Sequence, residues 1–493
     1  MGTKTVELNK NVTEFLKGTK KLFINGEFVE AESGKTFETY NPSTGEVLAV
    51  VSEASEKDID RAVQAAKRAF EEGPWPKMTA AERSHLMYKL SDLIEKHQEE
   101  LAIIETLDNG KPINEARVID LPNSIETYRY YSGWATKNMG QTIPISNDLL
   151  NYTKHEPVGV VGAIVPWNFP LMIAGWKVAP ALATGCTVVL KPAEQTPLSV
   201  LYLGKLIKEA GFPDGVVNIV PGFGESAGAA LVEHPDVNKI AFTGSTAVGQ
   251  NIMREAANTM KRVSLELGGK SPNIILPDAD LSKAVPGVFT GIMTNQGEVC
   301  SAGSRIFVHK DKYEQVIIEL TALIDKVKLG AGIEEETQMG PVVSKEQQER
   351  ILNYIKIGKQ EGARVISGGS CPESGYFIPP TIFADVKNEM KIAQEEIFGP
   401  TVVVIPFEDI DEVIAQANDS EYGLAAGVWT ENIRNAHYVA DRLKAGTVWI
   451  NTYLLVNPAA PFGGFKKSGF GRDMGSYALD NYTEVKSVWL SLE

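Results

Sequence analysis

Cysteine, histidine and net positive charge are scarce in this sequence of 493 residues, and each shortage excludes a class of protein. The three cysteines, Cys186, Cys300 and Cys371, are too few for a disulfide framework and favour a reducing compartment, so we expect a cytoplasmic protein. The six histidines form no HExxH motif or Cys/His cluster, so no metal site is predicted. The net charge of −15 has the wrong sign for binding nucleic acid or an anionic membrane surface.

Long membrane-spanning apolar runs and secretory signals are also missing. Residues 1–18 contain no apolar stretch of the kind that a signal peptide requires. The uncharged segment 157–176 is long enough to cross a bilayer, but Pro166, Asn168 and Pro170 would break a spanning helix. We therefore expect a strand buried on both faces, then a loop, then a helix.

Short β-branched runs alternate with segments of helical length through two stretches of the chain, which is typical of doubly wound parallel sheets. The first stretch has candidate strands at 158–165, 187–191, 216–220, 239–243 and 263–267, with helices at 197–210 and 247–258. The second has candidate strands at 272–276, 304–309, 401–407, 425–430 and 447–451, with helices near 311–327, 344–361, 409–417 and 431–444. The predicted fold class is α/β, with two doubly wound parallel-sheet domains, the first of them Rossmann-like.

Two strand-like pieces belong to neither alternation. Residues 137–155 hold two strand-like runs with no helix between them, and the last segment, YTEVKSVWLSL, reads as one long strand. An unpaired terminal strand is an aggregation hazard, and pairing with another subunit is one solution. We expect a small β arm that serves oligomerisation.

Near the N-terminus, local sequence signals predict a hairpin turn and the start or end of several helices. Asn25-Gly26 predicts a hairpin turn, Ser55 a helix cap, and Thr79 with Glu82 a capping box. The Asn109-Gly110 pair predicts the end of a further helix.

Two glycine-rich segments suggest phosphate binding, although each has a plain structural explanation. The segment 222–227 matches G-x-G-x-x-A, but it follows the third strand of its unit, where turn glycines are common. The segment 244–249 follows a strand and opens a helix that Ser245 or Thr246 can cap, which suits a pyrophosphate or an ordinary cap. Glu194, at the end of a predicted strand, fits either a ribose-binding acid or a solvated loop.

One cysteine and one acid are candidates for chemistry. Cys300 lies in a polar, glycine-rich loop before a strand, whereas Cys186 precedes a buried strand and Cys371 lies in a surface-like segment. Glu266 ends a strand and is followed by two glycines, which fits either a reacting group or an ordinary strand-end carboxylate.

These residues belong to a recognisable set of strings. In chain order they are PWNFP (166–170), KPAEQTP (191–197), FTGSTAVG (242–249), LELGGKSP (265–272), NQGEVCSAGSR (295–305), EEIFGP (395–400) and PFGGFKKSGFGRDMG (461–475). With all of them in this order, the sequence resembles the NAD(P)-dependent aldehyde dehydrogenase superfamily over essentially the whole chain. It most resembles bacterial members of the non-acylating, broad-substrate branch that includes retinal-oxidising enzymes.

The resemblance implies a reaction and a set of roles. Cys300 attacks an aldehyde, Asn168 and the backbone N–H of Cys300 hold the oxyanion, and Glu266 activates the water that hydrolyses the thioester. The expected cofactor is NAD, with NADP possible, because Glu194 would repel a 2′-phosphate. The implied cofactor-binding residues are Val165, Pro166, Trp167, Asn168, Lys191, Pro192, Ala193, Glu194, Gly224, Gly244, Ser245, Val248, Glu266, Leu267, Gly268, Gln347, Arg350, Glu396 and Phe398.

The implied substrate tunnel is mostly apolar, so we expect an aliphatic, aromatic or retinal-like aldehyde. Its residues are Phe169, Ile173, Trp176, Val299, Ser301, Leu455, Val456 and Phe462. A betaine-aldehyde enzyme is an alternative if Trp167 and Trp176 share an aromatic cage, although residues 454–456 add no aromatic ring. A CoA-acylating relative is a second alternative, against which Glu266 speaks.

The resemblance also implies domains and assembly. The cofactor domain comprises residues 1–136 and 156–267, the catalytic domain 268–473, and the oligomerisation arm 137–155 and 474–493. A dimer or tetramer of identical chains is expected. Two positions depart from many relatives, Ala247 and Glu298, and Glu298 is expected to raise the pKa of the Cys300 thiol if its carboxylate points inward.

Overall fold

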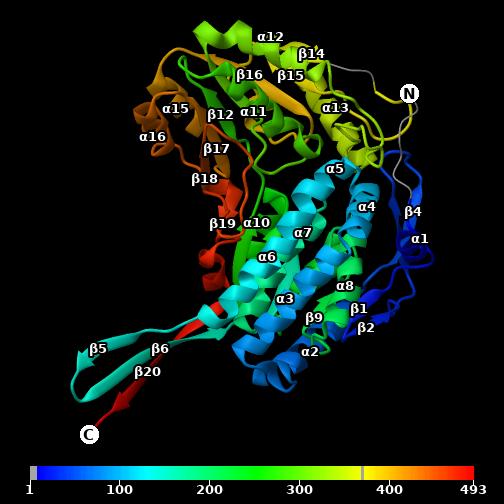
Figure 1. The fold of residues 1–493 in the computed structure, drawn as a ribbon, viewed down its shortest axis with the longest axis vertical. Coiled ribbons are helices and arrows are strands. Elements are labelled where there is room, and N and C mark those ends of the chain that lie inside the picture. The colour runs from blue at the N-terminus through cyan, green and yellow to red at the C-terminus, as the bar shows by residue number, and fades with distance from the viewer. Residues whose placement is uncertain (1–7, 368–370) are drawn as a thin grey trace.

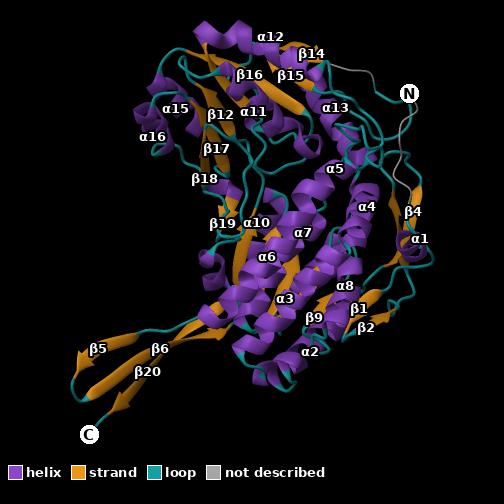
Figure 2. Cartoon of the chain, viewed as in Figure 1, coloured by secondary structure: helices purple, strands orange, loops and turns teal. Residues whose placement is uncertain are grey.

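The computed structural model describes residues 8–367 and 371–493. Residues 1–7, part of the segment in which no signal peptide is predicted, lie outside the described residues. Two α/β units lie one above the other, and a long β arm projects from the lower one (Figure 1). Helices cover the sheets of both units (Figure 2). This arrangement agrees with the predicted fold class.

The first unit is built on five parallel strands, as the sequence predicted. They are β7 (Val160–Ile164), β8 (Thr187–Lys191), β9 (Val217–Ile219), β10 (Lys239–Thr243) and β11 (Arg262–Glu266). All residues of β7, β8 and β10 are buried, which is why their sequences are continuous apolar runs rather than alternating ones. The segment 157–176 is resolved as expected, with β7 followed by a loop and a helix, and none of the described helices is long and apolar enough to cross a bilayer.

The strand order of this sheet creates a crevice at one edge. The order is β19-β11-β10-β7-β8-β9-β1-β2, so the chain moves outward from β7 in one direction and then returns to β10 on its other side. Loops leaving β7 and β10 therefore diverge at their carboxyl ends, where α/β sheets bind ligands. The outer strands are β1 (Leu22–Ile24), β2 (Glu27–Val29) and β19 (Gly469–Phe470).

Helices and a small hairpin complete the first unit. The helices are α1 (Lys10–Leu16), α2 (Glu56–Glu71), α3 (Ala80–Lys96), α4 (Gln98–Asn109), α5 (Ile113–Glu115), α6 (Leu121–Trp134), α7 (Pro170–Thr184), α8 (Leu198–Ala210), α9 (Ala229–Glu233) and α10 (Thr246–Ala256). The hairpin pairs β3 (Thr36–Tyr40) with β4 (Val47–Ser52). The predicted caps are confirmed: Ser55 and Thr79 each form a capping box, and Gly110 ends α4 in the left-handed conformation.

The second unit has a seven-stranded sheet in the order β14-β15-β16-β13-β12-β17-β18, parallel except for β14. The strands are β12 (Pro272–Ile275), β13 (Arg305–His309), β14 (Arg364–Ser367), β15 (Thr381–Ala384), β16 (Thr401–Phe407), β17 (Ala425–Trp429) and β18 (Thr447–Ile450). The helices are α11 (Leu281–Met293), α12 (Tyr313–Ile324), α13 (Lys345–Gln360), α14 (Lys391–Gln394), α15 (Ile410–Asn418) and α16 (Ile433–Ala440).

The short link between the sheets determines where the two units meet. Residues 267–271 lead from the carboxyl end of β11 directly to the amino end of β12. The carboxyl edge of the first sheet therefore meets loops at the amino edge of the second. Residues 295–300, which precede β13, and residues 395–400, which precede β16, reach the crevice in this way.

Some elements were not predicted from the sequence. The pattern gave no helix at α11, because Pro286 and Gly287 lie within it, and no strands at β14 and β15, which flank a glycine-rich segment. The predicted helix 431–444 is shorter in the structure and ends at Ala440.

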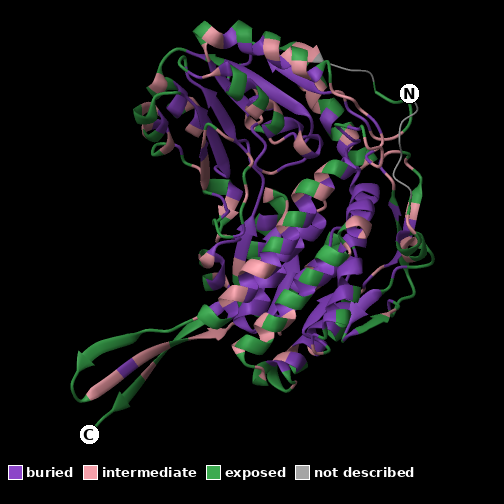
Figure 3. Ribbon diagram, viewed as in Figure 1, coloured by how far each residue is buried: buried purple, intermediate pink, exposed green. Residues whose placement is uncertain are grey.

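The β arm contains three strands, β5 (Thr142–Ser146), β6 (Leu149–Pro157) and β20 (Thr483–Ser491). β6 lies in the middle and pairs antiparallel with both neighbours. The final strand is thus paired within its own chain, and the hairpin runs to Pro157 rather than to residue 155. The arm is exposed along most of its length (Figure 3).

Gly110 offers a test of how the units are packed. Its φ is +98°, and a Cβ there would lie 2.8 Å from the Pro341 carbonyl oxygen of the second unit. Gly211 has a similar φ of +91° with no atom within 4 Å of such a Cβ. We expect Gly211→Ala to cost about 1–2 kcal/mol of stability for the left-handed backbone alone, and Gly110→Ala about 1–3 kcal/mol more for the added contact. Denaturant unfolding of both variants measures the difference, and equal losses would contradict the close packing at Gly110.

Candidate active site

Cys300 lies on a tight loop where the two units meet. The preceding residues Asn295, Gln296 and Gly297 all have positive φ, a conformation that non-glycine residues adopt at an energetic cost and that often marks functional sites. The cysteine is free and half-buried. Cys186 is fully buried between α7 and β8 and Cys371 is exposed, as predicted. Cys300 is therefore the cysteine placed for chemistry.

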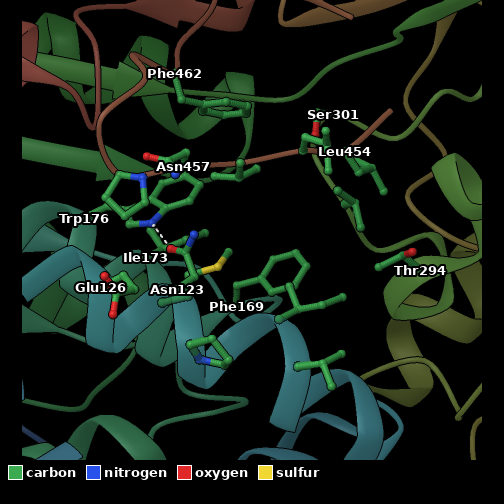
Figure 4. Close-up of a pocket in the computed structure, with 18 of the residues that line it drawn as sticks. Asn123, Glu126, Phe169, Ile173, Trp176, Thr294, Ser301, Leu454, Asn457 and Phe462 are labelled. Carbon is green, nitrogen blue, oxygen red and sulfur yellow. Dashed lines mark hydrogen bonds between the residues drawn. The ribbon is translucent and has the colours of Figure 1, made fainter. Parts of the chain in front are cut away.

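Two cavities meet at Cys300, since this residue lines both of them. The larger has a volume of about 770 Å³, within the range of small-molecule sites. Every predicted tunnel residue lines it, including Phe169, Ile173 and Phe462 (Figure 4). Cys300 thus lies at one end of a mainly apolar pocket.

One whole wall of this cavity was not predicted from the sequence. That wall comes from α6 and the turn before it: Val118, Ile119, Pro122, Asn123, Glu126, Arg129 and Tyr130. In the sequence this segment resembles an ordinary surface helix, because its polar residues recur at the spacing of a solvent-exposed helix face. Only the tertiary packing of α6 beside α7 brings these side chains to the pocket.

The smaller cavity, about 240 Å³, is polar and lies along the crevice of the first sheet. Predicted cofactor residues that line it are Pro166, Trp167, Asn168, Gly244, Ser245, Leu267, Gly268, Gln347, Arg350, Glu396 and Phe398. The other predicted cofactor residues, Val165, Lys191, Pro192, Ala193, Glu194, Gly224, Val248 and Glu266, are not in its lining. These residues lie at or just after the carboxyl ends of the same five parallel strands. Most of them are therefore on the same edge of the sheet, outside the cavity. Lining residues that the sequence analysis missed are Gln195, Thr243, Val343, Ser344 and Glu346.

The features of this crevice fit a dinucleotide. Ser245 caps α10 by accepting a hydrogen bond from the Val248 backbone N–H at 3.4 Å, so the amino end of the helix opens toward the cavity. At Gly268 a Cβ would collide with the Glu396 carboxylate, so the backbone passes close beside this acid. Lys191 and Glu194 lie together, with 3.4 Å between Nζ and Oε2.

Helix α13 holds the loop that carries Glu396 and Phe398. Gln347 donates through Nε2 to the Phe398 carbonyl at 2.6 Å, and Arg350 donates through Nη2 to the Glu396 carbonyl at 2.7 Å. The Glu396 carboxylate accepts from the Gly269 N–H at 2.9 Å, and burial raises its pKa. This loop is therefore held by α13 on one side and by the link between the two sheets on the other.

Asn168 is fixed in the wall beside Cys300. Its Nδ2 donates to the Glu298 carbonyl at 2.9 Å, and its own carbonyl accepts from Lys111 Nζ at 2.9 Å and Asn295 Nδ2 at 3.0 Å. Lys111 is fully buried and also contacts Asp120 at 2.5 Å. The Asn168 amide has a second N–H, which is available to a ligand in the cavity.

The expectation for Glu298 is wrong. Its carboxyl accepts from the Val343 N–H at 3.1 Å, and burial raises its own pKa well above the usual range. Burial raises the pKa of the Cys300 thiol to about 12, with further contributions from the carboxylates of Glu396 and Glu266. Glu298 is therefore not among the groups that raise the pKa of the Cys300 thiol.

Glu266 ends β11 with its side chain 4 % exposed. Within the described residues its carboxylate oxygens have no hydrogen-bond partner. Burial raises its pKa well above the usual value, and Asp473 adds to this while Lys177 opposes it. The Lys177 ammonium lies 2.9 Å from Asp473, and both side chains are buried. This ion pair was not predicted from the sequence, because its two residues are far apart in the chain.

The proposed tryptophan cage is also wrong. Trp167 lines the polar cavity and packs edge-on against Phe398 at 5.2 Å, whereas Trp176 lines the apolar cavity and contacts Phe462 at 5.5 Å. The two indoles therefore face different spaces and cannot surround one cation.

Comparison with known proteins gives consistent results. Residues 28–488 match the model of the aldehyde dehydrogenase family. The chain is 62 % identical to DhaS of Bacillus subtilis, classed by name among the aldehyde dehydrogenases, over all of both chains. It is 52 % identical to the human mitochondrial aldehyde dehydrogenase over 95 % of this chain and 91 % of the other. Among solved structures, an NAD⁺ complex of a Bacillus cereus aldehyde dehydrogenase superposes with a TM-score of 0.98 at 64 % identity, covering 99 % of this chain and all of that one.

Proposed function

Because this chain belongs to the aldehyde dehydrogenase family, we propose that it oxidises apolar aldehydes to carboxylic acids with NAD as hydride acceptor. The observation that carries the proposal is the position of Cys300, which lines both an apolar cavity and a polar one. The aldehyde enters through the first and the cofactor occupies the second.

The first half of the reaction belongs to Cys300 and Asn168. The Cys300 thiol gives up its proton to solvent, its Sγ bonds to the aldehyde carbon, and the carbonyl oxygen becomes an oxyanion. The free N–H of the Asn168 amide and the backbone N–H of Cys300 stabilise this charge. A bound nicotinamide supplies the acceptor for the hydride that the adduct carbon loses. The acyl group then remains on Cys300 as a thioester.

Glu266 performs the second half. Its raised pKa makes its carboxylate a stronger base than an exposed glutamate, and its oxygens have no partner among the described residues. It takes a proton from the water that attacks the thioester, and Cys300 leaves as thiolate. Lys177 and Arg472 oppose the rise in the Glu266 pKa, whereas Asp473, the partner of Lys177, adds to it.

Replacing the base should separate the two halves. We expect Glu266→Gln to release about one NADH per active site in a burst and then turn over on the order of 10²–10⁴-fold more slowly, because the thioester persists. Cys300→Ala is the matched control and should show neither burst nor turnover while still binding NAD. Stopped-flow absorbance measures both phases. Steady turnover of Glu266→Gln at the native rate would assign the base to another residue.

The preference for NAD rests on Glu194. Its side chain lies beside Lys191 at the end of β8 and is partly exposed, so both can reach a ribose laid along this edge. The carboxylate can accept from two ribose hydroxyls, whereas a 2′-phosphate would bring like charge against it. Lys191 offsets part of this repulsion, so NADP remains a weaker cofactor.

Glu194→Ser should move the selectivity toward NADP. We expect the ratio of kcat/KM for NADP to that for NAD to rise on the order of tenfold, equivalent to about 1.4 kcal/mol. Glu209→Ser, an exposed acid near the end of α8, removes the same charge and should leave the ratio unchanged. An unchanged ratio in Glu194→Ser would place this residue away from the ribose.

A CoA-acylating reaction remains the second candidate for the fate of the thioester. Glu266 favours hydrolysis, since transfer to CoA needs no water-activating base. Acyl-CoA formation when CoA is added to the assay would favour the second candidate, and free acid alone supports the first.

We also propose that the β arm joins chains into a dimer or tetramer. Val485 and Trp489 are 62 % and 58 % exposed and point to the same face of β20, because strand side chains alternate. Ile143 and Ile145 on β5 are exposed as well. Apolar side chains on a projecting sheet are typical of a surface that another subunit covers.

Polar substitution on this face should weaken assembly. We expect the double variant Val485→Ser with Trp489→Ser to shift the mass measured by light scattering toward the monomer. Met260→Ser with Ile433→Ser removes apolar residues that are 90 % and 66 % exposed outside the arm, and should leave the mass unchanged. A native chain that is monomeric at micromolar concentration would contradict the proposal.

A further inference from the structure

One amide in the wall of the apolar cavity has a fixed orientation. Trp176 on α7 donates through its indole Nε1 to Asn123 Oδ1 on α6 at 2.8 Å (Figure 4). An indole N–H can only donate, so the Asn123 atom that faces it must be the oxygen. The amide nitrogen therefore turns away from Trp176.

This nitrogen has an unused donor capacity. Among the residues that the structure describes, no hydrogen bond from Asn123 Nδ2 is found, whereas the backbone carbonyl of Asn123 accepts from the Thr127 hydroxyl at 2.7 Å. Asn123 is half-buried, and the neighbouring lining residues Phe169, Ile173 and Phe462 offer no acceptor side chain. A half-buried donor that has no partner among the described residues gains free energy when a ligand brings an acceptor to it.

The charges at this wall determine which acceptor is favoured. Arg129, also on α6, is bound by three carboxylates, those of Asp92, Glu95 and Glu126. One cation against three anions gives this cluster, of which Arg129 and Glu126 line the cavity, a net negative charge. A substrate carboxylate would be repelled there, whereas a neutral ether, carbonyl or hydroxyl oxygen would not.

We propose that the physiological substrate is an apolar aldehyde that carries a neutral hydrogen-bond acceptor away from its aldehyde group, and that Asn123 recognises this acceptor. The inference rests on the proposed function, because it assumes that the aldehyde carbon reaches Cys300. The apolar chain fills the cavity between the two contacts, and the amide N–H of Asn123 selects one position along it.

Aldehydes with an oxygen placed at successive positions test the proposal. In a set of equal-length alkanals, each methylene in turn is replaced by an ether oxygen, and kcat/KM is measured for each relative to the parent alkanal. We expect one oxygen position to stand out above its neighbours by about threefold to tenfold, the effect of one neutral hydrogen bond. A semialdehyde with a terminal carboxylate should be a poorer substrate than its methyl ester.

Variants assign the effect to the amide nitrogen. Asn123→Asp keeps an acceptor for Trp176 but replaces the donor with oxygen, so the preferred ether position should lose its advantage. Asn123→Leu removes both groups and should also abolish the preference. Thr294→Val is the matched control: it removes a hydroxyl that lines the same cavity but already donates to the Thr290 carbonyl at 2.9 Å, so the preference should persist.

The outcomes separate the two levels of the argument. Failure of the native protein to oxidise any parent alkanal would overturn the proposed function. Oxidation of alkanals with no favoured ether position, or with a preference that survives in both Asn123 variants, would overturn the role of Asn123 alone. A preference lost equally in Thr294→Val would reject the amide as its source.

Discussion

The geometry of the site depends on the contacts of one buried group, the ammonium of Lys111. It lies just after α4, pairs with Asp120 at the start of α6 and donates to the Asn168 carbonyl at the end of the β7 loop. Asn168 in turn holds the Glu298 carbonyl, two residues before Cys300. Breaking one partner from a buried ion pair typically costs about 3–5 kcal/mol, so this chain of contacts is rigid. Through it, the helical layer of the first unit positions the cysteine loop of the second.

Much of this architecture can be predicted from the sequence, because its signals are local. Continuous β-branched runs mark strands that are buried on both faces, and serine, threonine and glycine mark where α2, α3 and α4 begin or end. Local pattern made Glu266 and Cys300 candidates, as an acid at a strand end and a cysteine in a glycine-rich loop, and the roles predicted for them came from the family resemblance.

The remaining features depend on packing between distant segments, which spacing does not encode. Nothing in the sequence near Lys177 points to Asp473, and the pattern of α6 does not show that Asn123 faces a cavity. General rules place sites at the carboxyl ends of strands, yet Cys300 lies at the amino end of β13. The short link 267–271 explains this, since it turns the amino edge of one sheet toward the carboxyl edge of the other.

In the β arm, β20 near the end of the chain pairs with β6, which comes much earlier in the sequence. The register pairs Thr483 with Pro157 and Ser491 with Leu149. During synthesis β6 therefore emerges with an open edge and stays so until the ribosome has released almost the entire polypeptide. A nascent or prematurely terminated chain lacks β20 and displays that unpaired edge, a feature that chaperones and proteases can recognise.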